Sequence, residues 1–330
     1  MDDLVPQGYN DGNRAFLQAL MARGSITYHE AKPIIAAIKT AQQDDDGDRQ
    51  RVDPNSVTQE EFAAYIGAAQ EVVSHFDYEV RNAMHQVRKD RVYALVNTTS
   101  DPMTQLATLH SADEIAFVKR VIDGMFEKHN TRRMEVMCVD SMQANKLRHA
   151  PKADGDESIA DDSVVQTQAG QGGIKSIKSS EVASMLAAMV DEGWFEKSRE
   201  GYYSLSTRAL LELRAWLVDT YNDPDLGPDE WQRIKFCEAC KEIVTVGQRC
   251  AERDCNVRIH DICEDAFWRT RRDNTCPKCD KAWSGKHFVG LKAVTETEAY
   301  KRAKRNSGRE RGSVLEQIIQ DEGGETDEEE

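Results

Sequence analysis

Apolar residues recur at helical spacing through the first 75 residues, and the pattern then changes to that of strands. Three runs predict helices, the first ending at Gly24. They span residues 13–23, 27–41 and 59–75. Pro33 lies inside the second run, so Lys32 or Pro33 is an alternative start for that helix. Residues 77–97 alternate apolar and polar side chains around Arg88-Lys89-Asp90-Arg91, which predicts two strands joined by a charged turn.

The same order of elements recurs in the next part of the chain. Ser111-Ala112-Asp113-Glu114 is a capping box that opens an amphipathic helix, and residues 135–149 predict a second helical run. A third helix is expected from Ser179 or Ser180 to Gly193. The segments 194–197 and 202–205 then predict a hairpin, and the leucine-rich residues 207–220 a last helix.

Three helices followed by a two-stranded wing are typical of a winged-helix domain, so the sequence predicts two of them in tandem. We place the first at residues 1–105 and the second at 106–222, with a flexible polar insertion at 151–175. The helices in the recognition position, 27–41 and 179–191, carry few basic side chains. Protein partners are therefore favoured, and DNA contact is expected to be indirect or weak.

Seven of the eight cysteines lie between Cys237 and Cys279, with one histidine among them at metal-ligand spacing. The potential ligands, in chain order, are Cys237, Cys240, Cys250, Cys255, His260, Cys263, Cys276 and Cys279. Eight thiolate and imidazole ligands make two closed, structural, tetrahedral zinc sites. A disulfide framework is disfavoured, because only one other cysteine is present and nothing suggests secretion. The sequence therefore predicts two zinc ions as cofactors, in a domain at residues 223–292.

The ligand spacing leaves two ways of sharing the metals. Taken consecutively, the first four ligands hold one zinc and the last four the other. Taken as an interleaved cross-brace, the arrangement of RING domains and PHD fingers, Cys237, Cys240, His260 and Cys263 hold zinc one, and Cys250, Cys255, Cys276 and Cys279 hold zinc two. The histidine in the fifth position and the Cys276-Pro277-Lys278-Cys279 ending favour RING. Asn274 occupies the position where a PHD finger usually carries tryptophan.

Charge, hydropathy and the state of the cysteines indicate the cellular compartment of the protein. The 330 residues carry a formal net charge of −15. We expect residues 293–330 to form a disordered tail that is first basic and then acidic, and much of the negative charge lies at its acidic end. Its basic cluster 301–305 fits either a nuclear-import signal or a solvated helix face. No apolar run reaches the roughly 18 residues of a membrane span, and residues 1–4 do not resemble a signal peptide. Reduced cysteines indicate cytosol or nucleus.

The domain order and the zinc-module motifs resemble one family: the RING-bearing non-SMC element subunits of the SMC five/six chromosome complex. The motifs are Cys237-Glu238-Ala239-Cys240, Gly247-Gln248-Arg249-Cys250, Cys255-Asn256-Val257-Arg258-Ile259-His260 and Cys276-Pro277-Lys278-Cys279-Asp280-Lys281-Ala282-Trp283. The resemblance implies an α+β protein that binds a MAGE-family subunit and a kleisin subunit in a nuclear DNA-repair complex. It also implies ubiquitin-ligase activity that depends on the MAGE partner.

A RING ligase supplies no nucleophile and acts by positioning a charged ubiquitin-conjugating enzyme. The usual docking patch of a RING predicts that Ala239, Phe267, Trp268 and Pro277 contact that enzyme. Ala239 is smaller than the usual aliphatic residue, and Asp280 stands where arginine or lysine is common, so the sequence predicts weak or partner-dependent activity.

Three alternatives remain beside this interpretation. The aromatic residues of the zinc module could serve only to pack it, which would leave a non-catalytic, zinc-stabilised assembly subunit. Cys138 is the one cysteine outside the cluster, and its apolar surroundings indicate a core residue rather than a thioester relay. A histone-tail reader is disfavoured, because Glu242 and Asp254 alone do not make a peptide groove.

Overall fold

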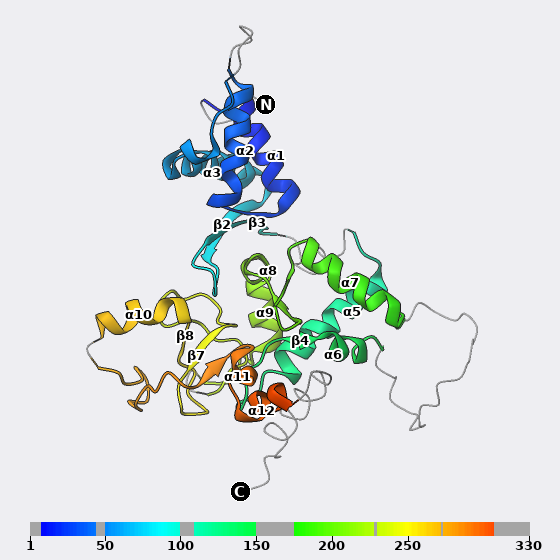
Figure 1. The fold of residues 1–330 in the computed structure, drawn as a ribbon, viewed down its shortest axis with the longest axis vertical. Helices are drawn as coiled ribbons and strands as arrows, with labels where there is room; N and C mark the ends of the chain where they lie inside the picture. The colour runs from blue at the N-terminus through cyan, green and yellow to red at the C-terminus, as the bar shows by residue number, and fades with distance from the viewer. Residues whose placement is uncertain are drawn as a thin grey trace, which may run out of the picture.

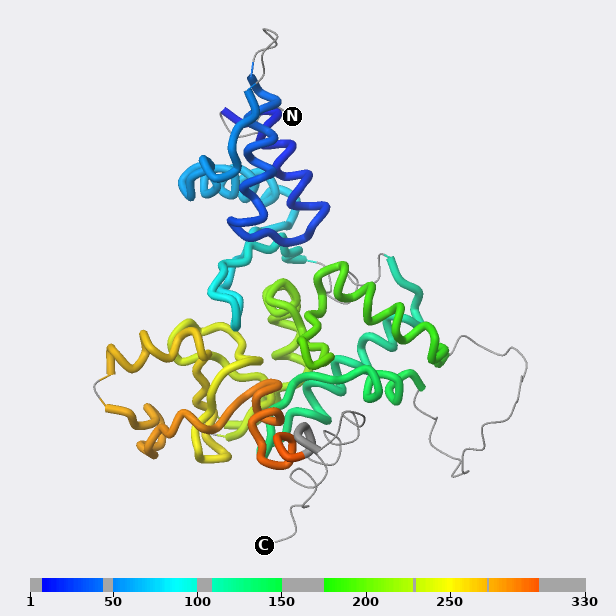
Figure 2. The backbone as a smooth tube through the Cα atoms, viewed as in Figure 1, coloured from blue at the N-terminus to red at the C-terminus, as the bar shows by residue number. Residues whose placement is uncertain are grey.

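The computed structural model describes residues 8–43, 50–99, 109–149, 175–227, 230–271 and 273–306. The insertion predicted at 151–175, except its last residue, and the acidic end of the predicted tail lie outside the described residues. Three units are seen in Figures 1 and 2: an N-terminal one in blue and cyan, a central one in green, and a zinc module in yellow and orange. The hairpin formed by β2 and β3 of the first unit points towards the other two (Figure 1).

The N-terminal unit has the element order of a winged helix. Its elements are α1 (Asp11–Arg23), β1 (Ser25–Thr27), α2 (Tyr28–Ala41), η2 (Pro54–Ser56), α3 (Gln59–Val73), η3 (Ser74–Phe76), β2 (Tyr78–Met84) and β3 (Arg91–Asn97). The strands form an antiparallel sheet in the order β1-β3-β2. Phe16, Leu20, Ile35 and Phe62 form its core with other buried side chains.

The start of α2 differs from the alternative suggested by Pro33. Thr27 caps the helix: its hydroxyl accepts the Glu30 backbone N–H at 3.3 Å, and the Glu30 carboxylate accepts the Thr27 N–H at 2.8 Å. This reciprocal cap satisfies donors of the first turn, so the helix begins at Tyr28 with Pro33 inside it. The helix predicted over 27–41 is therefore confirmed, and the alternative start at Lys32 or Pro33 is wrong.

The central unit repeats the topology of the first. Its elements are α5 (Ala112–Asp123), the π-helical turn η4 (Gly124–Lys128), β4 (Val139–Asp140), α6 (Ser141–Lys146), α7 (Ser179–Asp191), β5 (Phe195–Lys197), β6 (Tyr202–Leu205), α8 (Thr207–Glu212) and α9 (Arg214–Tyr221). The sheet order β4-β6-β5 matches β1-β3-β2, which confirms two tandem winged helices. Each sheet contains a short first strand that the sequence pattern did not reveal.

The helix predicted over 135–149 is mostly absent. Met137 has a positive φ of 46°, which no helix accommodates, and Val139 and Asp140 pair with β6. Asp140 then caps the short α6 by accepting the Gln143 N–H at 2.8 Å. The apolar residues of this segment are therefore buried through extended backbone, which apolar spacing alone does not distinguish from a helix.

The zinc module contains a small antiparallel sheet and one helix. Its elements are β7 (Gly247–Arg249), β8 (Arg258–Ile259), α10 (Asp261–Thr270) and β9 (Phe288–Val289), with the strands in the order β8-β7-β9. Two further helices follow, α11 (Lys292–Thr295) and α12 (Glu298–Asn306). The disordered tail predicted from residue 293 is therefore wrong for residues 293–306. Val294 and Tyr300 are buried against Met134, Val136 and Cys138 of the central unit, and this packing holds the segment.

The three units pack directly against one another. Leu211 of α8 is buried against Ala83, Ala94 and Val96 of the N-terminal sheet. The core of the central unit continues without a break into the zinc module through Ile234, Ile243, Val244, Ile259 and Val289. The zinc module therefore shares its apolar core with the second winged helix. In the part of the chain that the structure describes, we find no helix with the length and hydropathy of a membrane span.

Candidate metal centres

Two knuckles of the same backbone geometry open and close the zinc module. In the first, the Cys237 carbonyl accepts the Lys241 N–H at 2.9 Å, and in the second the Cys276 carbonyl accepts the Asp280 N–H at 3.0 Å. Lys241 and Asp280, each directly after a Cys-x-x-Cys pair, have φ of 62° and 55°. Aspartate tolerates this left-handed region better than most residues, which gives Asp280 a structural reason to follow the last ligand.

The eight ligands predicted from the sequence form two interleaved groups. Cys237, Cys240, His260 and Cys263 make the first cluster, and Cys250, Cys255, Cys276 and Cys279 the second. Within each cluster the ligand atoms all lie within 4.8 Å of one another. The interleaved cross-brace is therefore the arrangement found, and the consecutive alternative does not match the fold.

The first cluster is built around His260, which is 2 % exposed at the start of α10. Its Nδ1 lies 3.2 Å from Cys240 Sγ and 3.9 Å from Cys263 Sγ. Its Nε2 lies 3.1 Å from the Ile243 carbonyl, so Nε2–H donates and Nδ1 is left to bind a metal. This second contact is the one that metal-binding histidines usually make, and three sulfurs with one imidazole nitrogen suit zinc.

The second cluster has four sulfur ligands. Cys250 Sγ lies 3.4 Å from Cys279 Sγ, and Cys255 Sγ lies 3.6 Å from Cys276 Sγ. The backbone N–H of Glu252 donates to Cys250 Sγ at 3.4 Å, as expected beside a thiolate. Both clusters therefore fit zinc in closed, structural sites, in which the metal supplies folding free energy rather than a reactive water.

A buried charged cluster, which the sequence analysis missed, joins this module to the second winged helix. Glu135 is 1 % exposed, and its carboxylate accepts two hydrogen bonds from Arg258, at 2.5 and 2.7 Å. Lys235 and Arg249 lie 3.0 and 3.3 Å from the same carboxylate. Arg258 also donates to the carbonyl of Cys255, a ligand of the second cluster, at 2.7 Å. A single acidic residue within the apolar run 134–139 was the signal that could have revealed it.

The residues predicted to dock a conjugating enzyme lie around the two clusters. Ala239 is exposed in the first knuckle, whereas Phe267 and Trp268 on α10 and Pro277 in the second knuckle are half-buried. Phe267 stands one helical turn after Cys263, so both share a face of α10. Its ring packs edge-on against Trp268 at 4.9 Å between centroids.

Part of this aromatic surface also stabilises the module. The Trp268 and Trp283 rings lie 5.5 Å apart, and the indole N–H of Trp283 donates to Gln248 Oε1 at 2.9 Å.

Cys138, the one cysteine outside the clusters, is 3 % exposed. Burial raises the pKa of its thiol, and the nearby Asp140 adds to this effect. The interpretation of Cys138 as a core residue is therefore confirmed.

Comparisons with known proteins agree with this architecture. The family described as "Nse1 non-SMC component of SMC5-6 complex" matches residues 13–213, and a "RING-like domain" family matches residues 237–279. The chain is 20 % identical over 276 residues, 83 % of its length, to the human "Non-structural maintenance of chromosomes element 1 homolog", of which 84 % is covered. A Xenopus laevis protein of the same description is 24 % identical over 58 % of this chain and 56 % of its own. The Schizosaccharomyces pombe "Non-structural maintenance of chromosomes element 1" is 21 % identical over 66 % of this chain and 74 % of its own.

A solved structure shows the same fold. A chain of an "Nse1-Nse3-Nse4 complex" superposes with a TM-score of 0.60 at 19 % sequence identity, covering 84 % of this chain and 99 % of that one. The resemblance drawn from the zinc-module motifs is thereby confirmed. With a family match over more than half of its residues, a RING-like module and this structural relative, the chain belongs to the Nse1 family of non-SMC components of the SMC5-6 complex.

Proposed function

We propose that this chain is a partner-dependent RING-type ubiquitin ligase as well as a structural subunit of its chromosome-maintenance complex. In this proposal the zinc module, residues 223–292, positions a ubiquitin-conjugating enzyme, and the winged helices, residues 1–105 and 106–222, bind a MAGE-family subunit and a kleisin subunit in the nucleus. The description of the structural relative as a complex of three Nse proteins supports the expectation of two partner subunits.

One observation carries the catalytic part of the proposal. The first cluster brings the knuckle that carries Ala239 up to the start of α10, on which Phe267 shares a face with the ligand Cys263. Two segments far apart in the sequence thus present an exposed small residue and an aromatic ring around one metal centre. Such a surface positions a charged carrier without any nucleophile of its own.

Single-turnover discharge of a ubiquitin-charged conjugating enzyme tests this function. We expect the full chain with a co-purified MAGE-family subunit to accelerate discharge, and the chain alone to accelerate it little. Absence of acceleration in both samples, with two zinc ions bound per chain, would contradict ligase activity.

Replacing Phe267 by alanine, or Pro277 by alanine, is expected to reduce discharge about tenfold or more, because either change removes apolar contact area from the docking surface. Zinc content and binding to the partner subunit should stay unchanged, since neither side chain is a predicted ligand. The matched control is Thr270→Ala, an exposed position at the end of α10. Unchanged discharge in both variants would contradict the assigned docking surface.

Replacing Ala239 by isoleucine is expected to raise discharge at limiting carrier. Ala239 is exposed, so the larger side chain fits without disturbing the fold, and its added apolar surface would be buried on docking. About 1–2 kcal/mol of added affinity corresponds to roughly 5- to 30-fold tighter carrier binding. Ala239→Ser, which adds little apolar area, serves as the control. Equal carrier affinity in the isoleucine and serine variants would contradict this prediction.

The second candidate function is that of a zinc-stabilised assembly subunit without catalysis. Two observations favour it: the side chain at Ala239 is small, and the core of the zinc module is continuous with that of the second winged helix. The Phe267→Ala variant separates the two functions, because an assembly subunit would show no discharge in either the parent or the variant and would bind its partners in both.

A further inference from the structure

The wing between β2 and β3 carries two adjacent side chains that contact different units. His85 lies on the side of the second winged helix, where its Nε2 is 3.1 Å from both carboxylate oxygens of Glu196. Its Nδ1 accepts the backbone N–H groups of Val87 and Arg88, at 3.1 and 3.0 Å. Nε2 must therefore carry the proton that reaches Glu196. His85 fixes both the shape of the wing turn and its distance from β5.

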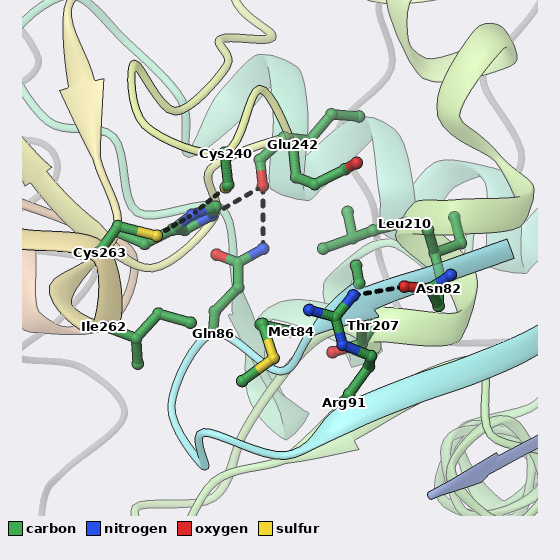
Figure 3. Close-up of a pocket in the computed structure, with 14 residues that line it drawn as sticks. Asn82, Met84, Gln86, Arg91, Thr207, Leu210, Cys240, Glu242, Ile262 and Cys263 are labelled. Carbon is green, nitrogen blue, oxygen red and sulfur yellow. Dashed lines mark hydrogen bonds between the residues drawn. The ribbon is translucent and has the colours of Figure 1, made fainter. Parts of the chain in front are cut away.

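Gln86, the next residue, is 6 % exposed and inserts into the zinc module. Its Nε2 donates to the Ile243 carbonyl at 3.0 Å, and its Oε1 accepts the backbone N–H groups of Thr245 and Val246, at 3.0 and 2.8 Å. One carboxamide thus bonds to donors and an acceptor of the segment that leads from the first knuckle into β7. Figure 3 shows this carboxamide extending from the wing towards that segment, near Cys240 and Cys263.

The Ile243 carbonyl is the point at which the wing and the first cluster meet. It accepts one hydrogen bond from Gln86 and another from His260 Nε2–H, at 3.1 Å. The opposite nitrogen of the His260 ring faces the sulfurs of Cys240 and Cys263. An unbroken series of contacts therefore runs from the wing of the first winged helix to the metal-binding nitrogen.

The same wing also walls a cavity beside the cluster. A pocket of about 280 Å³ lies between the wing, α8 and the first knuckle, and it is lined by Gln86 and Met84 together with Cys240, His260 and Cys263. The second cluster is linked instead to the second winged helix, because Arg258 donates to both the Cys255 carbonyl and the Glu135 carboxylate. The wing of the first winged helix therefore contacts the surroundings of the first cluster, and Glu135 contacts those of the second.

We propose that Gln86 is a positioning residue for His260, so that the seating of the first winged helix on the zinc module determines how firmly the first cluster holds its metal. The inference rests on the zinc occupancy included in the proposed function and adds a means of regulation to it. Groups that orient a ligand histidine commonly change metal affinity 10- to 100-fold when they are replaced. A partner that moves the first winged helix would act on the docking surface at Ala239 through this contact.

The test is the rate of zinc transfer from the full chain to a chelator. Gln86→Glu keeps the shape and the acceptor oxygen but replaces the donor N–H with an oxygen that faces the Ile243 carbonyl. We expect one of the two zinc ions to leave about tenfold faster and the other to leave at its usual rate. Cadmium-113 resonances of the metal-substituted protein identify the affected site, because the first has three sulfurs and one nitrogen and the second has four sulfurs.

Matched variants complete the experiment. Val87→Ala changes an adjacent, 64 % exposed wing residue and should leave both rates unaltered. Gln86→Ala removes the donor without adding a repulsive oxygen. Its zinc should therefore leave the first cluster faster than in the parent protein and more slowly than in Gln86→Glu. It provides the same site-selective measurement if the glutamate variant does not fold. Unchanged rates in the Gln86 variants, or equal acceleration at both sites, would overturn the inference.

Ubiquitin discharge is measured separately, so the two proposals fail independently. Site-selective zinc loss in a protein that never discharges a carrier would support the positioning role and remove the ligase. Discharge by a protein whose rate of zinc release is unchanged in the Gln86 variants would support the ligase and remove the positioning role.

Discussion

Replacing Glu135 by alanine is expected to lower the free energy of unfolding by about 3–5 kcal/mol, because it leaves buried cations without their anion. Arg258, Lys235 and Arg249 are each 7 % exposed or less, and all three lie within 3.3 Å of this one carboxylate. Domains are stable by only about 5–15 kcal/mol, so the loss should release the zinc module from the second winged helix. Urea denaturation of the full chain measures the change.

The control is Glu200→Ala, at an exposed position of the hairpin in the same winged helix. Burial acts to raise the pKa of Glu135, but Arg258, Lys235 and Arg249 outweigh it and hold the pKa below its ordinary value of 4.5. The stabilisation is therefore complete above about pH 4.5 and declines as the pH falls below it. Equal stability of Glu135→Ala and Glu200→Ala at neutral pH would contradict the role of the buried cluster.

Removal of zinc is expected to unfold residues 237–283 and to loosen the second winged helix, while the first keeps its own fold. Zinc contributes roughly 10–16 kcal/mol of apparent folding free energy in small zinc modules. Ile243, Val244 and Ile259 of this segment belong to the core of the second winged helix, so their loss exposes that core. The first winged helix has a separate core built around Phe16 and Phe62. Hydrogen exchange before and after chelation shows which amides lose protection.

His260→Ala should produce the same pattern without a chelator, and His287→Ala, at an exposed position outside the clusters, should not. Unchanged amide protection of residues 237–283 after complete zinc loss would mean that the shared apolar core alone holds the module. Loss of protection in the first winged helix to the same extent would contradict the independence of its core.

The metal centres could be predicted from the sequence because their ligands are chemically distinctive and closely spaced. Four pairs of ligands, two of them Cys-x-x-Cys, leave few ways to share two metals, and the histidine position favoured the interleaved one. The buried cluster of Glu135 and Arg258 could not be found in this way. Its members are 123 residues apart, and nothing in their spacing indicates that they meet. Gln86 was missed for the same reason, because its partners are 157 to 160 residues distant.

Among the elements, long amphipathic helices were predicted well and short strands were not. The capping box at Ser111 predicted the start of α5, since local hydrogen bonds determine it. The two- and three-residue strands β4 and β1 exist only because β6 and β3 pair with them, and such pairing leaves no local pattern. The helix α12 was read as part of a disordered tail because it is mostly charged, and only Tyr300 among its described side chains is buried.

The chain leaves the second winged helix to form the zinc module and then returns to it, since Arg233, before the first zinc ligand, and Tyr300, after the last strand of the module, both contact that domain. Contacts at both ends of the module restrict its rotation relative to the second winged helix, whereas a domain joined by a single linker rotates freely. A ubiquitin thioester docked on it would therefore point along one fixed direction relative to the winged helices. The position in which partner subunits hold the substrate, rather than motion of the zinc module, would then determine which lysines the thioester reaches.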